Sequence, residues 1–376
     1  MNPTAPAPEI LEDTPKKTGL GLKKPLAFFA LGCLAVGSFR LARGRRGWME
    51  WLAGHISTPW RDGVSGLLDA LPFSGAEAVC LLAGLAAVWY LVRGRGRLAA
   101  RLVWLAGAAV WVYLGVCLFW GAHYYTTSFA QRAGIELQSV ETDHLRRTAQ
   151  WFRDMANETA PTVKRDEHGR FDYTWQEIIA ESEGLYAGAE EKYPFLTGPE
   201  RAAKPALFSW PMSLTGFTGY IFPFTGESTL NVHCPEVFLP VTIAHEFSHQ
   251  KGVAQEQEAN FVGIEACITS GKAEWVYSGY LFGYLQLANA LWKVDPDLWQ
   301  ELEAGLCPQA KADMAVNNEY WEKYKDEPVA KAAEATYEGF LYSYDQFLGM
   351  KSYGACVDLL VAEYRHKLFW EPLAPT

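Results

Sequence analysis

Hydrophobic residues are concentrated in three long segments in the first third of the chain. Residues 25–42, 76–93 and 102–122 are almost entirely apolar, and the third segment carries no charged residue. About 20 consecutive apolar residues are enough for a helix to cross the hydrocarbon core of a bilayer. We therefore predict a transmembrane region over residues 23–123 that contains about three helices. A disordered tail rich in proline, threonine and lysine precedes it over residues 1–22.

We do not expect the first apolar segment to be a cleavable signal peptide. Basic residues at positions 40–46 follow it where a cleavage site of small residues would be needed. As an alternative, the first two segments could be buried helices of a soluble domain. The uncharged third segment favours a membrane region.

From residue 124 onward the hydrophobic pattern is mostly helical. Apolar side chains recur every three or four residues, for example at Leu145, Ala149, Phe152 and Met155. Residues 208–234 differ, because glycines and Pro223 lie among aromatic and β-branched residues, which predicts a short hairpin or two strands. The predicted fold is membrane-anchored α+β. About three N-terminal transmembrane helices precede a mostly helical domain over residues 124–376 that has a small β-sheet.

Charge divides the chain at the same place. Residues 1–123 hold 13 Lys and Arg against 7 Asp and Glu, whereas residues 124–376 hold 20 against 36. No basic stripe remains outside the segments that flank the predicted spans, so nucleic acid is excluded as a partner. The expected surroundings are a lipid bilayer and an aqueous compartment.

The distribution of Lys and Arg around the spans predicts their orientation. If the amino terminus is cytoplasmic, eight lie inside: Lys16, Lys17, Lys23, Lys24, Arg93, Arg95, Arg97 and Arg101. Five then lie outside: Arg40, Arg43, Arg45, Arg46 and Arg61. The bias predicts a multi-pass protein of the cell membrane whose large domain is extracytoplasmic.

Four of the seven cysteines lie in the acidic part of the chain, at Cys234, Cys267, Cys307 and Cys356. An even number allows two disulfides in an oxidising compartment. Buried free thiols are the preferred alternative.

A short motif near the middle of the predicted domain carries the candidate chemistry. Residues 245–249 read His-Glu-Phe-Ser-His, which matches the zinc-binding pattern H-E-x-x-H. Positions four residues apart share one face of a helix, so His245 and His249 can bind one Zn²⁺ ion. Glu246 projects beside them, where it can act as a general base.

A catalytic zinc site needs a third protein ligand. Gly252 ends the first helix, and a second helix that begins soon after it can fold back on the first. Glu256 and Asn260 share one face of this second helix. We predict Glu256 as the third ligand and Asn260 as a partner that orients a histidine. Glu258 stays the alternative ligand, although we expect Glu258 and Glu265 to lie on a solvated face.

The predicted reaction is hydrolysis of a peptide bond by a zinc-activated water, in a peptide or protein substrate. Glu246 takes the water proton and returns it to the leaving amine. An edge strand within residues 216–232 could pair with an extended substrate. Tyr353, Tyr277 and His233 are candidates for stabilising the oxyanion, and the sequence does not rank them.

These residues resemble a known family. The runs GFTGYIFPFTGESTLNV at 216–232, LPVTIAHEFSHQKGVAQEQEANF at 239–261, YSGYL at 277–281 and SYG at 352–354 are similar to the bacterial domain-of-unknown-function 3810 family. The likeness extends over nearly the whole chain from the first apolar segment. Its members resemble membrane-anchored zincins, with a few amino-terminal spans and a carboxyl-terminal H-E-x-x-H domain.

A broader resemblance is to the gluzincins, which include thermolysin and the CAAX-type membrane proteases. Their third ligand is a glutamate followed four residues later by an aspartate. Glu256 matches the glutamate, whereas Asn260 replaces the aspartate. The interval from His249 to Glu256 is short for a gluzincin. Gly252 stands where metzincins keep a glycine, with Gln255 in place of their third histidine.

Two other functions fit the sequence. A zinc-binding pseudoenzyme or membrane scaffold would keep the ligands without turnover, but the intact Glu246 favours an enzyme. A transporter is disfavoured, because the apolar segments contain no paired charges apart from Glu77.

Overall fold

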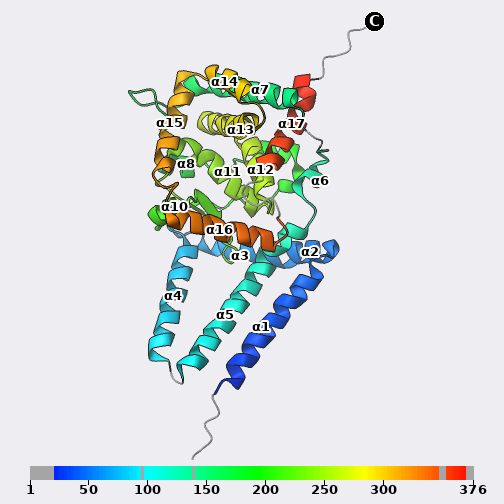
Figure 1. Ribbon diagram of the computed structural model, residues 1–376, viewed down its shortest axis with the longest axis vertical. Helices are drawn as coiled ribbons and strands as arrows, with labels where there is room; N and C mark the ends of the chain where they lie inside the picture. The colour runs from blue at the N-terminus through cyan, green and yellow to red at the C-terminus, as the bar shows by residue number, and fades with distance from the viewer. Residues whose placement is uncertain (1–20, 95–96, 138–139, 347–352, 370–376) are drawn as a thin grey trace, which may run out of the picture.

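The computed structural model describes residues 21–94, 97–137, 140–346 and 353–369. Among these residues, three helices are long and apolar enough to cross a membrane: α1 (Lys23–Ala42), α4 (Gly75–Arg93) and α5 (Leu98–Phe119). They extend together away from the rest of the molecule (Figure 1). Many of their apolar side chains are exposed, as suits helices that face lipid. The three predicted spans are confirmed.

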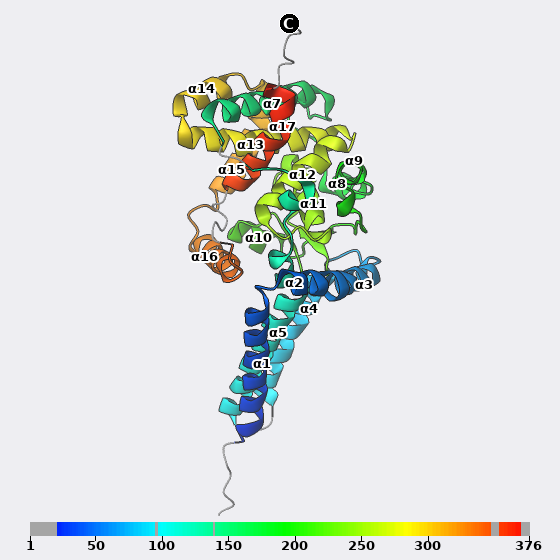
Figure 2. The same cartoon turned by 90° about the vertical axis from the view of Figure 1, so that its right-hand side faces the viewer.

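A helical rod that we call the platform lies between the first two spans in the sequence. It consists of α2 (Arg46–Leu52), a π-helical turn (Ala53–Ser57) and α3 (Thr58–Leu68). The platform lies across the ends of the spans and underneath the large domain (Figures 1 and 2). No sequence pattern predicts this rod, because arginines, glycines and a proline interrupt the apolar positions of residues 46–68.

The domain above the platform is built mainly from helices. The shorter ones are α6 (Phe129–Ala133), α8 (Trp175–Ala180), α9 (Ala187–Lys192), α10 (Ser209–Thr215) and α14 (Pro296–Ala304). The longer ones are α7 (Thr142–Thr159), α11 (Leu239–Gln250), α12 (Glu256–Thr269), α13 (Ala273–Val294), α15 (Pro308–Glu322), α16 (Pro328–Ser343) and α17 (Tyr353–Phe369). The predicted helical domain is therefore confirmed.

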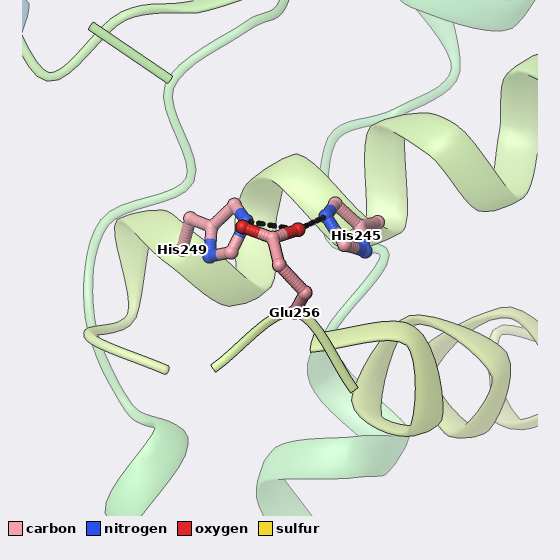
Figure 3. Close-up of side chains that lie close together, drawn as sticks. All are labelled: His245, His249 and Glu256. Atoms are coloured by element: carbon pink, nitrogen blue, oxygen red, sulfur yellow. Dashed lines mark ion pairs between the residues drawn. The ribbon is translucent and has the colours of Figure 1, made fainter. Parts of the chain in front are cut away.

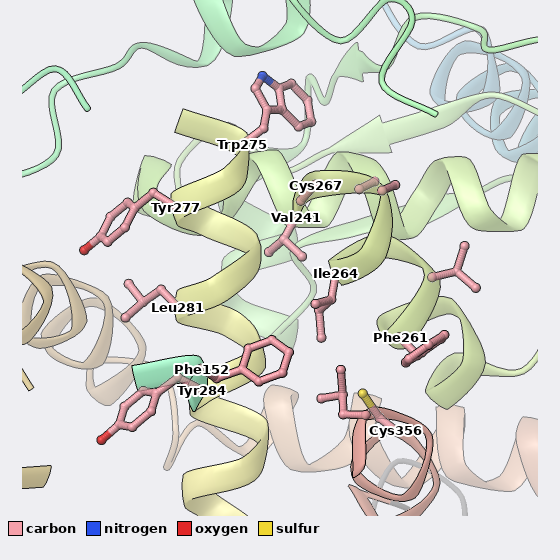
Figure 4. Packing of buried hydrophobic residues seen from close by; sticks show 14 of the residues in the cluster. Phe152, Val241, Phe261, Ile264, Cys267, Trp275, Tyr277, Leu281, Tyr284 and Cys356 are labelled. Carbon is pink, nitrogen blue, oxygen red and sulfur yellow. The ribbon is translucent and has the colours of Figure 1, made fainter. Parts of the chain in front are cut away.

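The core of the domain is centred on α12 and α13. Helices α7, α11 and α17 pack around this pair, and their apolar side chains interlock in the middle (Figure 4). Gly279 of the YSGYL run lets α13 approach α12 closely, because a Cβ at this position would lie 2.7 Å from the Cβ of Cys267. This part of the family-like sequence therefore serves helix packing.

A small sheet lies beside α11. Its strands are β1 (Lys204–Pro205), β2 (Gly219–Ile221) and β3 (Ser228–Leu230), in the order β1-β3-β2. Strands β2 and β3 form an antiparallel hairpin, and β1 pairs with β3 in parallel. The predicted hairpin is confirmed, whereas α10 occupies part of the stretch expected to be extended.

The prediction that Glu258 and Glu265 lie on a solvated face is wrong. Only 5% and 1% of their surfaces are exposed, because α12 is packed against α9, α11, α13 and α17. The Glu258 carboxylate accepts hydrogen bonds from the backbone N–H groups of Phe129 and Ala130 at 2.8 and 3.0 Å. Glu265 forms an ion pair with Lys192 at 2.7 Å. Each buried carboxylate is stabilised by partners that are distant in the sequence.

All seven cysteines lie among the described residues, and each is a free thiol. This agrees with the preferred alternative to disulfide bonds.

Candidate metal centre

Helix α11 carries the H-E-x-x-H motif and ends two residues before a glycine. Gly252 has a φ of 84°, and its N–H donates to the carbonyl oxygen of His249 at 3.0 Å. The N–H of Val253 donates to Ser248 O, also at 3.0 Å. Only glycine adopts this left-handed conformation without strain. The turn reverses the chain, so α12 begins at Glu256 and packs back on α11, as predicted.

The two helices approach each other closely beside the motif. A Cβ on Gly263 of α12 would lie 2.9 Å from the backbone nitrogen of His245. The Tyr186 hydroxyl also contacts α11, because it donates to the carbonyl oxygen of Ala244 at 2.6 Å. A larger residue at position 263 would separate α12 from α11, and would move Glu256 away from the histidines.

These helices bring the three predicted ligands together. His245, His249 and Glu256 each offer one ligand atom, and these atoms all lie within 4.8 Å of one another. Glu256 Oε2 lies 3.2 Å from His245 Nε2 and 3.7 Å from His249 Nε2. The two imidazoles lie on either side of the Glu256 carboxylate (Figure 3).

The spacing and chemistry of this group fit a divalent metal ion. Ligands that lie about 2.0–2.1 Å from a tetrahedral ion are about 3.4 Å apart, which is between the two observed distances. His249 Nδ1 lies 2.7 Å from the carbonyl oxygen of Val253. A carbonyl oxygen only accepts, so this contact places a proton on Nδ1, and the neutral imidazole then offers the Nε2 lone pair to a metal ion. Two histidines and one glutamate form a donor set found in catalytic zinc sites.

Helix α16 contributes a hydrogen bond to the third ligand. The Tyr337 hydroxyl donates to Glu256 Oε1 at 2.7 Å, which leaves Oε2 for the histidines or a metal ion. Burial, and then the Glu256 carboxylate, raise the pKa of Tyr337 well above its usual range, so the hydroxyl stays a donor. Burial also raises the pKa of Glu256, but His249 and His245 outweigh it and hold that pKa well below its usual range.

Glu246 is buried beside the candidate ligands. Only 3% of its surface is exposed, and its Oε2 atom has no hydrogen-bond partner among the described residues. The pKa of its carboxyl group is raised to about 8. Burial is the largest cause, His245 acts in the opposite direction, and Glu256 raises the pKa further. A metal cation in the site would lower this pKa and favour the carboxylate. A buried carboxyl group with an unpaired oxygen and a shifted pKa has the properties of a general base.

Strand β2 lies next to Glu246 at the edge of the sheet. A Cβ on Gly219 would lie 2.8 Å from Glu246 Oε1, so glycine keeps this approach open. Thr218 O accepts from the N–H of Asn231, and the N–H of Phe222 donates to Glu227 O, just beyond the two ends of β3. Because hydrogen bonding alternates along an antiparallel pair, the peptide groups of Gly219 and Ile221 face the unpaired edge. An extended peptide could pair there beside Glu246.

The structure separates the other predicted ligand candidates from the site. Glu258 binds the N-terminus of α6 and is not part of the metal-binding group. The side chain of Asn260, in α12, makes no hydrogen bond to any described residue, and the Nδ1 atom of His245 is buried without a partner among them. The structure therefore does not contain the predicted contact between Asn260 and a histidine.

The predicted oxyanion candidates are not brought to the site. The Tyr277 hydroxyl donates to Asp313 at 2.6 Å in a buried network with Arg165. His233 is exposed, and its ring makes no hydrogen bond to a described residue. The side chain of Tyr353 lies outside the described part of the structure.

Two residues at the ends of the membrane spans contact His249, and no sequence pattern predicted either contact. The ring of Trp120 meets the His249 ring edge to face, with centroids 5.2 Å apart. The guanidinium of Arg61 is buried and donates to the carbonyl oxygen of His249 at 3.2 Å. Arg61 also lies over Trp120 and contacts the ring of His123. A cation near the C-terminal end of α11 is favourable for the helix dipole.

The hydrogen bond from Tyr337 yields a testable expectation. Tyr337→Phe should weaken Zn²⁺ binding by about 10- to 100-fold, the usual cost of losing a hydrogen bond to a ligand. The measurement is a competition titration of the full chain against a chelating dye. Tyr342→Phe is the matched control, because Tyr342 lies on the same helix and is 47% exposed. Equal zinc affinities in the two variants would contradict the role of Tyr337.

The fold and the site define a class of protein. It is a mostly helical protein with three apolar helices long enough to cross a membrane, and it has a candidate metal centre of two histidines and a glutamate. The chain belongs to the family described as "Protein of unknown function (DUF3810)", whose model matches residues 57–361. The match begins in the platform, so the first span lies outside it. Searches of curated proteins and of solved structures found no match to this chain.

Proposed function

We propose that this protein is a zinc-dependent metallopeptidase, anchored in the membrane by its three spans. The observation that carries the proposal is the position of Glu246. Its buried carboxyl group is adjacent both to the candidate ligands and to the unpaired edge of β2. A site that held a metal for structural reasons alone would need neither feature.

His245, His249 and Glu256 would hold the metal ion. Zn²⁺ in such a site supplies Lewis-acid chemistry, because it lowers the pKa of a water and polarises a carbonyl group. Glu246 accepts the proton of the attacking water at its carboxylate and delivers it to the leaving amine. The peptide groups of Gly219 and Ile221 hold the substrate in an extended conformation.

Removal and return of the metal test this function. The purified full chain, loaded with zinc, is incubated with a broad peptide library, and the products are identified by mass spectrometry. We expect cleavage to stop after treatment with a chelator and to return after addition of one equivalent of Zn²⁺. Cleavage that survives full removal of the metal would contradict the proposal.

We also propose that the domain lies on the extracytoplasmic side. Arg40 and Arg43 bind groups at the end of α16, and Arg61 is buried. Of the five arginines on this side, only Arg45 and Arg46 are exposed, and the bias of eight Lys and Arg against five supports this orientation.

Protease protection in spheroplasts tests the orientation. Three spans place the start of α1 at Lys23 and the domain on opposite sides of the membrane (Figure 1). A carboxyl-terminal epitope should therefore be digested in unlysed spheroplasts, while an amino-terminal epitope on the same chain stays protected. The opposite pattern would reverse the proposed orientation.

A further inference from the structure

The candidate metal centre lies close to the ends of the membrane spans. Trp120 directly follows Phe119, the last residue of α5, and its ring contacts that of His249. Arg61 extends from the platform to the main chain of the same histidine. One side chain, that of Trp120, therefore connects His249 to the end of a membrane span, and another, that of Arg61, connects it to the platform.

The β2–β3 hairpin extends from the metal centre to the membrane region. Gly219 lies beside Glu246 at one end of β2. Phe224, in the turn that follows, packs so closely on α5 that a Cβ on Gly115 would lie 2.5 Å from its ring. The indole N–H of Trp60 donates to Phe224 O at 3.0 Å. Five residue steps separate Gly219 from Phe224, and those beyond Ile221 enter the turn, so the two positions are at most about 17 Å apart.

Exposed apolar side chains mark the level of the bilayer surface. They lie on the platform and at the start of α10, at Trp48, Trp51, Trp60, Leu207, Phe208 and Trp210. The N–H groups of Leu207 and Phe208 donate to Glu77, at the start of α4, at 2.7 and 3.1 Å. This contact fixes the segment at the end of a span. Tryptophan side chains at that level are typical of a membrane interface.

Hydrogen bonds to the membrane spans fix the position of the domain at the bilayer surface. Glu227, in the β2–β3 hairpin, accepts hydrogen bonds from the first two N–H groups of α4, those of Gly75 and Ala76, at 3.1 and 3.0 Å. Arg40, near the end of α1, donates to the carbonyl oxygen of Ser343 at 2.6 Å. Contacts to all three spans therefore keep the site near the bilayer surface.

We propose that the substrate is a polypeptide anchored in the same membrane, which is cut within about five residues of the bilayer surface. This inference rests on the proposed peptidase function. The substrate leaves the bilayer beside Phe224 and runs along the free edge of β2, so that its scissile bond lies at Glu246. An anchored chain also gains a high effective concentration at this site, which a free peptide lacks.

Cleavage of matched libraries in nanodiscs tests the inference. The zinc-loaded full chain is given 30-residue random tails, either attached to a single-span Leu/Ala helix or free in solution. We expect the anchored tails to be cut about 10²-fold faster or more, with the cuts clustered in the first five or so residues beyond the span. Equal rates, or cuts spread evenly along the anchored tails, would overturn the inference. The peptidase function would then stand, provided that Glu246→Gln abolishes the cleavage. If neither library is cut in a Glu246-dependent manner, both proposals fail.

A second measurement needs no turnover. Glu246→Gln in nanodiscs is irradiated with anchored tails that carry a benzophenone about 3 or about 20 residues beyond the span. We expect crosslinks to residues 219–224 from the near position only. Equal crosslinking from both positions would overturn the inference.

Discussion

Glu246→Gln should reduce peptide cleavage by about 10²- to 10⁴-fold, while the protein keeps one zinc ion per chain. The amide preserves the size of the side chain but accepts no proton from the attacking water. The ligands stay in place, because His245, His249 and Glu256 are unchanged. The measurement pairs cleavage rates with metal analysis on the same preparation. Equal activity in wild type and variant would rule out the mechanism, whereas a zinc-loaded wild type that cleaves nothing would favour a scaffold.

The same substitution should not destabilise the metal-free protein. Burial raises the pKa of Glu246 from 4.5 to about 8. Because this pKa is raised in the folded protein, the contribution of Glu246 to stability is fully present below about pH 4.5. That contribution is lost as the pH rises through about 8, because the unfolded chain releases the proton more easily than the folded protein. Glutamine does not titrate. The melting temperature of the variant should therefore equal that of the wild type at the low end of this pH range, and should exceed it by an increasing margin as the pH rises. A variant that melts lower throughout would show that its loss of activity reflects misfolding.

Loss of a ligand should remove the metal. His245→Ala and His249→Ala should each reduce zinc from one equivalent to a small fraction, because two protein ligands no longer define a tetrahedral site. Glu256→Ala should lose most of the affinity by the same reasoning. Metal analysis after dialysis against a weak chelator measures all three variants. One full equivalent of zinc in both histidine variants would show that the site is elsewhere.

Glu258→Gln is the matched control for Glu256→Ala. Glu258 lies two residues away on the same helix, but its carboxylate binds the N-terminus of α6. Glutamine keeps an acceptor oxygen there, whereas Glu258→Ala would leave two N–H groups without a partner and cost about 1–3 kcal/mol. We expect Glu258→Gln to keep its zinc. The reverse result would assign the third ligand to Glu258.

Local sequence patterns determined much of this protein. The three spans follow from apolar runs whose length matches the bilayer, which needs no information from other parts of the chain. The candidate ligands also follow from local rules. Helical periodicity aligns His245 with His249, and Gly252 turns the chain so that Glu256 returns to them.

Tertiary structure alone decided which distant side chains surround this site. Tyr337 is 81 residues from Glu256, and Arg61 is 188 residues from His249, so no periodicity connects them. The prediction that Glu258 and Glu265 are solvated is wrong for the same reason, because their partners are distant in the sequence. A charged residue on a helix favours a solvated face unless partners from other elements compensate its burial. The nearness of the candidate metal centre to the membrane likewise depends on the packing of α5, the platform and the β2–β3 hairpin against α11.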